Sequence, residues 1–503
     1  LSMNARTPTA AEASTMLMVA LGTTFVLGYV LNVALGWLLP SDGLGIYGSV
    51  NGIINILTLA LVGGFPWAIA KLLSENVSGE EKQRAFKSAL AANVLLGVLI
   101  SVAFYIVVSF FLDFPSSYVA AIPIVVATTL IFAVRFPYER ALQGVFRFKQ
   151  LALVQILIGL LRPALAIGLL LMGLGVYGAL TGGVLAAFIG TLVLAFLLRD
   201  ITFWKTPGWL NIRVLSFAAP MFVAFAGMTL LQNADILGVK LFADPNDSDR
   251  MAGYYQSALI ISRIPFFLAS AFASAIFSFI SRTMGGGMRT YGSMAIKYTF
   301  LFIVPVAIAF AAKPEYTITL FFPQEYAAAA SALAMVTIAY AFQALAQVTG
   351  TVFQADGRPR IPAIVLIIAA LLQLGIVAPL TMALGLKGAA LSTLIASASA
   401  ATALMVLYVG MSKLRVQPWW VIRACLALAG PSVVIILVPI PSKWVLPALW
   451  LLSAVLYFLL LALLRLLKSR DINVIRRSMP RCGVVDMPMA LVEGMVAFLG
   501  RER

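Results

Sequence analysis

The sequence predicts an all-α polytopic membrane protein with about fourteen transmembrane helices. Hydrophobic residues make up 62% of the 503 residues and charged residues only 11%, and the mean hydropathy is +1.01. Soluble domains are about 45–50% apolar and about a quarter charged, so a soluble fold would not bury this much apolar surface. The apolar residues also fall into long runs, and basic residues alternate in the linkers between them.

The runs are long enough to cross a bilayer, since a transmembrane helix needs roughly 20 apolar residues. The linkers are short, and only the tail from residue 468 leaves room for anything else. The fourteen predicted helices are 15–39, 47–70, 88–112, 118–137, 151–172, 176–198, 214–242, 253–280, 292–312, 326–350, 361–382, 386–410, 419–439 and 444–467.

The basic residues predict the orientation of these helices. Of the 35 Lys and Arg residues, 28 lie in the terminal segments, in every second linker or at the helix ends beside them, and five lie in or beside the opposite linkers. Because cytoplasmic loops are enriched in Lys and Arg, we expect a multi-pass plasma membrane protein with both termini cytoplasmic. The net charge of +16 is then explained by loops that face anionic lipid, and no nucleic-acid partner is expected.

Several chemistries are excluded or disfavoured by composition. The chain has no histidine, and its two cysteines, Cys425 and Cys482, lie far apart. Histidine-based metal sites and a disulfide framework are therefore excluded. No P-loop, HExxH or GxSxG motif is present, and no cleavage site follows the first run. We expect no enzyme, no metal and no cofactor, apart from a coupling Na⁺ or H⁺.

Three pairs of short segments repeat in the same order, about 208–212 positions apart. They predict two six-helix lobes of the same orientation, related by a pseudo-two-fold axis along the membrane normal. The predicted parts are an N-lobe (1–200), a C-lobe (201–412), two extra helices (413–467) and a basic, amphipathic cytoplasmic tail (468–503). The pairs are GLGIYGSV (43–50) with MAGYYQSA (251–258), ALQGVFRFKQ (141–150) with FQADGRPRIP (353–362), and GVYGAL (175–180) with GLKGAA (385–390).

These segments resemble the multidrug/oligosaccharidyl-lipid/polysaccharide (MOP) flippase superfamily over roughly residues 15–470. In GLGIYG (43–48) a G-x-Y turn precedes a helix that ends in the Pro-containing VGGFPWA (62–68), and this resembles the first two helices of the family. The polysaccharide/oligosaccharide branch looks nearest. The remaining resemblances are ERALQGVFRFKQ (139–150), AGYYQSALIISRIPFFLASAFASAIFSFISR (252–282) and FQADGRPRIPAIV (353–365).

The resemblance implies a flippase that moves polyprenyl-phosphate- or pyrophosphate-linked oligosaccharide or polysaccharide repeat units. The cargo would pass from the cytoplasmic to the outer leaflet by alternating access, and the flippase would act as a monomer whose partners are this glycan and membrane lipid. The alternative within the fold is a MATE-like multidrug exporter. Fourteen predicted helices instead of twelve, and no carboxylate in the middle of a first-lobe helix, favour the flippase. A membrane-embedded glycan enzyme is the rival from another class, and the short external linkers argue against it.

Two arginines lie within predicted spans and are candidates for contact with the cargo phosphate. Arg162 lies near the middle of its helix, just before Pro163, and Arg263 lies about ten residues into its helix. The planar guanidinium suits phosphate, although either arginine could instead be structural. Asp235 lies at a similar depth to Arg263, so the two form either an ion pair that fixes the lobe or, with Asn233, a site for the coupling cation.

Two further groups of polar residues are assigned with alternatives left open. The amides within spans either bind sugar hydroxyls or join helices to each other. Charged residues near two repeated cytoplasmic loops either set the topology or form a cytoplasmic gate. The sugar-binding candidates are Asn32, Asn51, Asn55, Gln155 and Gln232, and the gate candidates are Glu139, Arg140, Arg147, Arg358 and Arg360.

Overall fold

The structure, a computed structural model, contains helices and no strand in the residues that it describes. Each of the fourteen predicted runs overlaps one or more helices, which confirms the all-α class. Among the described residues, ten stretches are long and apolar enough to cross a membrane by length and composition. The described residues are 10–74, 79–110, 116–199, 212–280, 292–412, 418–464 and 466, so the predicted tail lies outside them.

The chain divides into two compact units. The first unit comprises Leu1–Ile260 and Pro359–Ala396, and the second comprises Ile261–Arg358 and Ser397–Arg503. Helices α10 and α15 each contribute to both units. The predicted lobe boundaries stay a prediction.

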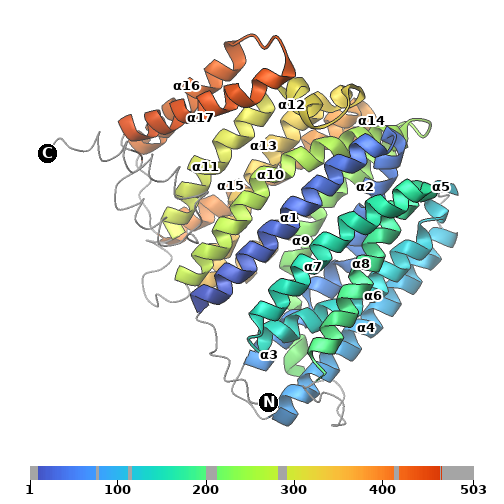
Figure 1. Ribbon diagram of the computed structural model, residues 1–503. Coiled ribbons are helices and arrows are strands. Elements are labelled where there is room, and N and C mark those ends of the chain that lie inside the picture. Colours follow the sequence, from blue (N-terminus) through green and yellow to red (C-terminus); the bar gives the residue numbers. More distant parts are fainter. Residues whose placement is uncertain are drawn as a thin grey trace. The chain divides into compact units, whose positions relative to one another are not determined.

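In the first unit, α7 packs against α1 and α8, and α9 packs against α2 and α14 (Figure 1). Helix α6 packs against α2, α3, α4 and α8. Long apolar helices therefore surround the polar residues discussed below. The helices of this unit are α1 (Ala10–Leu38), α2 (Ser41–Gly63), α3 (Phe65–Ser74), α4 (Gly79–Phe110), α5 (Ser116–Val119), α6 (Ile122–Gly144), α7 (Phe148–Leu169), α8 (Gly175–Leu197), α9 (Ile212–Phe242), α14 (Arg360–Leu384), and the first parts of α10 (Ser248–Ile280) and α15 (Leu386–Ser412).

The predicted helix 47–70 is wrong in one respect, because the structure breaks it into α2 and α3. Gly64 lies between them with φ −96° and ψ −111°, outside the helical region. Gly63 packs so closely on α9 that a Cβ there would lie 2.7 Å from the Cβ of Phe225. Pro66 follows and has no N–H to donate to a continuing helix. A Gly–Gly pair just before a proline therefore ends the helix inside an apolar run.

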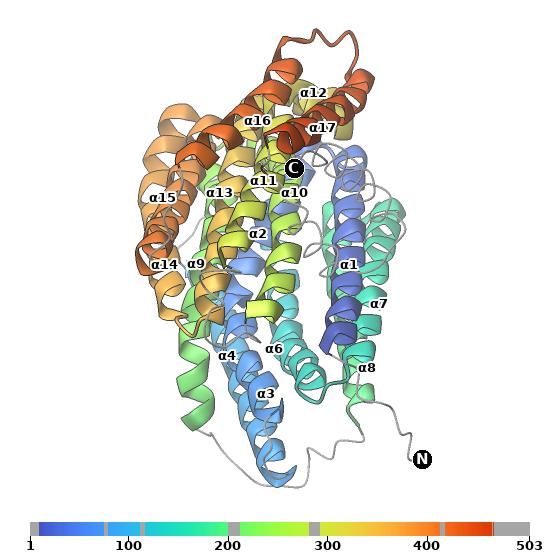
Figure 2. The ribbon, with the colours of Figure 1, turned by 90° about the vertical axis from the view of Figure 1, so that its left-hand side faces the viewer.

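In the second unit, α11 packs against α13 and α16, and α16 packs against α17 (Figure 2). Tyr298 and Leu301 of α11, Ala427 of α16, and Tyr457 and Leu461 of α17 form a buried apolar cluster. The elements here are α11 (Ser293–Ala312), α12 (Pro314–Phe321), the 3₁₀ segment η3 (Gln324–Ala329), α13 (Ala330–Ala355), α16 (Pro418–Leu437), the 3₁₀ segment η4 (Lys443–Val445), α17 (Leu446–Leu463), and the later parts of α10 and α15.

The turn between α6 and α7 has the same local structure as the turn between α13 and α14. Phe146 has φ +60° and Gly357, 211 positions later, has φ +80°, both in the left-handed region. The three backbone hydrogen bonds around each turn also match at this separation, so the repeated segments share a backbone conformation as well as a sequence pattern. These bonds run from the N–H of Val145 to Ala141 O, Phe146 to Gln143 O and Arg147 to Leu142 O, and from Asp356 to Val352 O, Gly357 to Gln354 O and Arg358 to Phe353 O.

The connection from α7 to α8, through the π-helical segment η1 (Leu170–Leu174), also matches the connection from α14 to α15. Gly175 has φ +55° and Gly385 has φ +58°, 210 positions apart. Gly178 approaches the carbonyl oxygen of Leu169, and Gly388 approaches that of Leu380, at nearly the same separation. The two-fold relation of whole lobes stays a prediction, but the local repeat at these helix ends is an observation.

Candidate functional site

The first turns of α2 and α10 touch through two glycines, one from each G-x-Y segment. A Cβ on Gly45 would lie 1.8 Å from the carbonyl oxygen of Asp249, and a Cβ on Gly253 would lie 1.9 Å from that of Ser41. Each glycine thus faces the carbonyl four residues before the other glycine, and no larger residue fits. The expectation that G-x-Y forms a turn before the helix is wrong. Both segments are helical, and their glycines allow two backbones to touch.

Tyr47, two residues after Gly45, contacts the arginine expected to bind phosphate. The Nη2 of Arg162 in α7 donates a hydrogen bond to the hydroxyl oxygen of Tyr47 at 3.3 Å. Tyr47 is 3% exposed, whereas the Arg162 side chain is exposed. Gly183 of α8 lies alongside, since a Cβ there would be 3.8 Å from Arg162 Nε. Helices α2, α7 and α8 therefore position this guanidinium.

Tyr255, two residues after Gly253, contacts a carboxylate. Its hydroxyl donates to Oδ2 of Asp235 at 3.0 Å, and the hydroxyl of Thr393 in α15 donates to the same oxygen at 3.0 Å. The backbone N–H of Ile236 donates to Oδ1 at 2.8 Å. Asp235 is 0% exposed, so these donors replace the water that a buried carboxylate would lose.

Gln373 of α14 extends this buried group, which we call the Asp235 cluster (Asp235, Tyr255, Gln373 and Thr393). Its Nε2 donates to Thr393 Oγ1 at 3.0 Å. Its Oε1 is buried and has no hydrogen-bond partner among the described residues. Gln373 Oε1 is therefore an acceptor without a donor, and Thr393 links its amide to the Asp235 carboxylate. A proton or a small cation could bind to this group of oxygen atoms.

Arg263, the other arginine expected at the cargo, has a tyrosine partner in the second unit. Its Nε donates to the hydroxyl of Tyr340 in α13 at 2.8 Å, and its guanidinium carbon lies 5.8 Å from the centre of that ring. Asp235 belongs to the first unit, so the expected Asp235–Arg263 pair stays a prediction. The roles proposed for Gln232 also stay predictions.

The candidate sugar-binding amides divide into locally bonded and long-range groups. The Nδ2 atoms of Asn32 and Asn51 each donate to the carbonyl four residues earlier, at 2.7 Å. Asn55 of α2 instead donates to Oδ1 of Asn233 in α9 at 3.1 Å. Gln155 has a buried Oε1 without a partner in the described part of the chain. The structure thus brings together Asn55 and Asn233, which the sequence assigns to different roles.

The gate candidates Glu139, Arg140 and Arg147 each have a partner among the described residues. Glu139 pairs with Arg135 at 2.8 Å, one turn earlier on α6. The guanidinium carbon of Arg140 lies 3.8 Å above the ring centre of Trp67 in α3. Arg147 donates to the carbonyl of Leu197 at the end of α8, at 2.9 Å. These contacts give each residue a structural partner, and a gating role stays a prediction.

The gate candidates of the second repeated loop have fewer partners. Arg358 pairs with Asp356 at 3.3 Å, and both side chains are partly exposed. Arg360 is exposed at the start of α14. An ion pair as exposed as Arg358–Asp356 contributes about 0–1 kcal/mol, so the charge of Arg358 adds little to the stability of the fold.

One partly buried polar cluster is not predicted from the sequence. Lys240 at the end of α9 pairs with Asp249 in the first turn of α10, and it also donates to Ser248 at 2.9 Å. Tyr118 of α5 donates to Asp249 at 2.8 Å. Burial, together with the nearby Asp249 carboxylate, raises the pKa of the Tyr118 hydroxyl, so it stays protonated and can donate. Lys240 is one of the five basic residues in or beside the opposite linkers. It lies 9 positions before Asp249, and Tyr118 lies 131 positions before Asp249, so no sequence pattern indicates this cluster.

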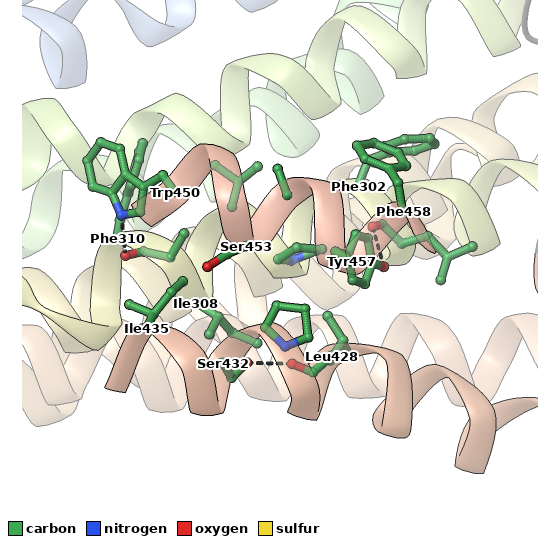
Figure 3. Close-up of a pocket in the computed structure, with 16 residues that line it drawn as sticks. Phe302, Ile308, Phe310, Leu428, Ser432, Ile435, Trp450, Ser453, Tyr457 and Phe458 are labelled. Atoms are coloured by element: carbon green, nitrogen blue, oxygen red, sulfur yellow. Dashed lines mark hydrogen bonds between the residues drawn. The ribbon is translucent and has the colours of Figure 1, made fainter. Parts of the chain in front are cut away.

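An apolar groove of about 270 Å³ lies between α11, α16 and α17 in the second unit (Figure 3). Its walls include Phe302, Leu428, Ile435, Trp450 and Phe458. The polar groups here are largely used within the protein: Trp450 Nε1 donates to a backbone carbonyl at 3.0 Å, and the Tyr457 hydroxyl to another at 2.7 Å. The lining can therefore contact a hydrocarbon chain but has few free polar groups that could bind a sugar or a phosphate.

Comparison with known proteins agrees with this architecture. The chain is similar in fold to the lipid II flippase MurJ in an inward closed conformation, with TM-score 0.73 and 15% identity over 89% of this chain and 98% of that one. It is also similar to a multidrug resistance MATE family transporter in an inward-facing conformation, with TM-score 0.60 and 18% identity over 76% and 94%. A MOP superfamily transporter from Pyrococcus furiosus with a binding pocket of reversed polarity gives TM-score 0.60 and 18% identity over 81% and 97%.

These likenesses confirm the MOP fold predicted from the sequence. A search of curated proteins returns no match. A family model, described as "Polysaccharide biosynthesis protein", matches residues 35–331, which is more than half of the chain. The chain is therefore a multi-pass membrane protein that belongs to the polysaccharide biosynthesis protein family and has a fold similar to that of the lipid II flippase MurJ and of MATE transporters.

Proposed function

We propose that this protein is a flippase for lipid-linked glycans. It moves polyprenyl-phosphate- or pyrophosphate-linked oligosaccharide or polysaccharide repeat units from the cytoplasmic to the outer leaflet, by alternating access between its two lobes, with both termini cytoplasmic. The observation that carries this proposal is Arg162, an arginine inside an apolar helix whose exposed guanidinium is anchored from the side by Tyr47.

The cargo poses a specific physical problem. Its lipid tail can remain in hydrocarbon, but the phosphate must pass through about 30 Å of it, where an unshielded charge is very unfavourable. Among the described residues, only Tyr47 accepts a hydrogen bond from the Arg162 side chain. A guanidinium has five N–H donors, so several are left for phosphate oxygens. This supports an anionic cargo.

The remaining parts of the cargo also have matching surfaces. The amide of Asn55 is exposed and already oriented by Asn233, which supports a role in hydrogen bonding sugar hydroxyls. The groove between α11, α16 and α17 supports an apolar site for part of the lipid tail, because its exposed lining consists almost entirely of hydrocarbon and aromatic side chains. Arg263, held by Tyr340, is the second candidate for the phosphate.

We also propose that Asp235 takes up the coupling Na⁺ or H⁺. An intramembrane carboxylate is a reasonable site for either ion. The buried, unpartnered Oε1 of Gln373 supports this role, since it supplies a neutral oxygen next to the carboxylate that Thr393 links to it.

The test is transport of the lipid-linked glycan by cells or vesicles that contain Arg162→Ala, Arg162→Lys or Arg263→Ala protein. A hydrogen bond to a charged group contributes about 1.5–3 kcal/mol, so Arg162→Ala should reduce transport at limiting cargo roughly ten- to a hundredfold. Lysine keeps the positive charge but lacks the planar set of N–H donors, so Arg162→Lys should transport faster than Arg162→Ala and more slowly than the wild type. Arg84→Ala is the matched control, because the partner of Arg84 among the described residues is Glu80, in an exposed pair.

Two results would contradict the proposal. Full glycan transport by both Arg162→Ala and Arg263→Ala protein, each present at normal amounts, would remove its basis. Export of cationic drugs without any flipping of glycan would favour the multidrug exporter instead.

A further inference from the structure

Tyr47 and Tyr255 occupy equivalent positions in the two halves of the chain. Each follows by two residues the glycine at which α2 and α10 touch. Both rings are buried, with exposures of 3% and 0%. Both hydroxyls reach a charged side chain: that of Tyr47 accepts from Arg162 at 3.3 Å, and that of Tyr255 donates to Asp235 at 3.0 Å.

The surroundings of the two tyrosines are equivalent as well. The matching turns before α7 and α14 are 211 positions apart, and on that count Arg162 corresponds to Gln373. The matching glycines at the start of α8 and α15 are 210 positions apart, so Gly183 corresponds to Thr393. Arg162 lies beside Gly183, just as Gln373 hydrogen-bonds Thr393.

One repeated framework thus holds opposite charges in its two halves. In the first half the long side chain on α7 is a cation, and its neighbour on α8 has no side chain. In the second half the side chain on α14 is a neutral amide, its neighbour is a threonine, and α9 supplies a carboxylate. A tyrosine hydroxyl serves both halves because it can accept from a guanidinium and donate to a carboxylate.

We propose that Tyr47 is a positioning residue for the anionic part of the cargo and that Tyr255 is the equivalent positioning residue for the coupling cation. Tyr47 holds the Arg162 guanidinium in an orientation in which the remaining N–H groups of the guanidinium can donate to phosphate oxygens. Tyr255 fixes one oxygen of Asp235 in the same way. This assignment rests on the proposed function and adds a division of labour between the two halves of the repeat.

The test compares Tyr47→Phe with Tyr255→Phe, which lose the same single oxygen at equivalent positions. Each protein is purified, checked for a single symmetric gel-filtration peak, and reconstituted into liposomes that contain a pyrophosphate-linked glycolipid. The KM for the glycolipid and the maximal rate are measured over a series of Na⁺ concentrations and pH values. Tyr47→Phe should raise the KM about three- to tenfold, the factor expected for a net hydrogen-bond loss of roughly 0.5–1.5 kcal/mol, and should leave the cation dependence unchanged. Tyr255→Phe should shift the cation dependence and leave the KM unchanged.

A merely structural role would change both parameters together in both variants, and that result would overturn the inference. An unchanged KM in Tyr47→Phe would also overturn it. A double-mutant cycle adds a second readout: Tyr47→Phe should have no further effect on KM in an Arg162→Ala background if it acts through that arginine. Additive effects would contradict this.

The same measurements separate this inference from the proposed function. If Arg162→Ala is impaired while Tyr47→Phe transports normally, only the role of Tyr47 fails. If Arg162→Ala and Arg263→Ala both transport normally, the proposed function itself fails.

Discussion

The contact between α2 and α10 predicts that alanine at Gly45 disrupts the crossing of these two helices. A Cβ there would lie 1.8 Å from the Asp249 carbonyl oxygen, whereas ordinary van der Waals contact begins at 3.4 Å. The two helix backbones would have to separate by roughly 1.6 Å, and neither can relieve the overlap by rotating a side chain. Forcing an extra group into a close-packed contact costs about 1–3 kcal/mol.

The assay is the apparent melting temperature in detergent, followed by the intrinsic fluorescence or by the amount of monodisperse protein after heating. Gly43→Ala is the matched control on the same helix, because its Cβ would meet its nearest neighbours at 3.5 Å. Gly45→Ala should melt several degrees below the wild type, and Gly43→Ala should melt close to it. The effects of Gly45→Ala and Gly253→Ala should be less than additive, because one separation of the helices relieves both overlaps. Equal melting temperatures for Gly45→Ala and Gly43→Ala would refute the close backbone contact.

The remaining predictions concern three side chains. Lys240→Met should lower stability by about 1–3 kcal/mol, because it leaves Asp249, whose side chain is 26% exposed, without its cation, and Asp249→Asn combined with it should recover part of the loss in the same melting assay. Arg147→Ala should cost about 1 kcal/mol through the lost bond to the Leu197 carbonyl and should leave the initial rate of glycan transport unchanged; a large loss of transport with normal stability would instead indicate a gating role. Asp235→Asn should abolish the Na⁺ or pH dependence of transport, and a cation dependence equal to that of the wild type would exclude Asp235 as the coupling site.

Much of the fold follows from the sequence because a membrane helix is a local feature. A run of about 20 apolar residues must satisfy its backbone groups within itself, so its position can be predicted without knowing its neighbours. The break at Gly64 escaped prediction because the run 47–70 is apolar throughout, and the cause is the close approach of Gly63 to Phe225 on another helix. The G-x-Y segments were assigned to turns because glycine is common at helix ends, whereas here it is needed inside a helix crossing.

The site was less predictable because its contacts join distant parts of the chain. Arg162 and Asp235 stand out in the sequence, since charges are rare within membrane spans. Nothing local indicates that Tyr47 lies against Arg162, 115 positions away, or that Thr393 lies against Asp235, 158 positions away. Only the internal repeat relates these residues in the sequence, because it places Tyr47 and Tyr255 each two positions after a glycine.

The central claim is that Arg162 binds the phosphate of a lipid-linked glycan during its passage across the membrane. The most direct measurement is flipping by the purified protein in liposomes, with a fluorescent pyrophosphate-linked glycolipid and a neutral glycolipid of the same sugar and tail compared side by side. The account predicts that the wild type flips the pyrophosphate-linked lipid much faster than the neutral one, and that Arg162→Ala removes most of this preference while Arg84→Ala keeps it. Equal flipping of the two lipids by the wild type, or an undiminished preference in Arg162→Ala, would contradict it.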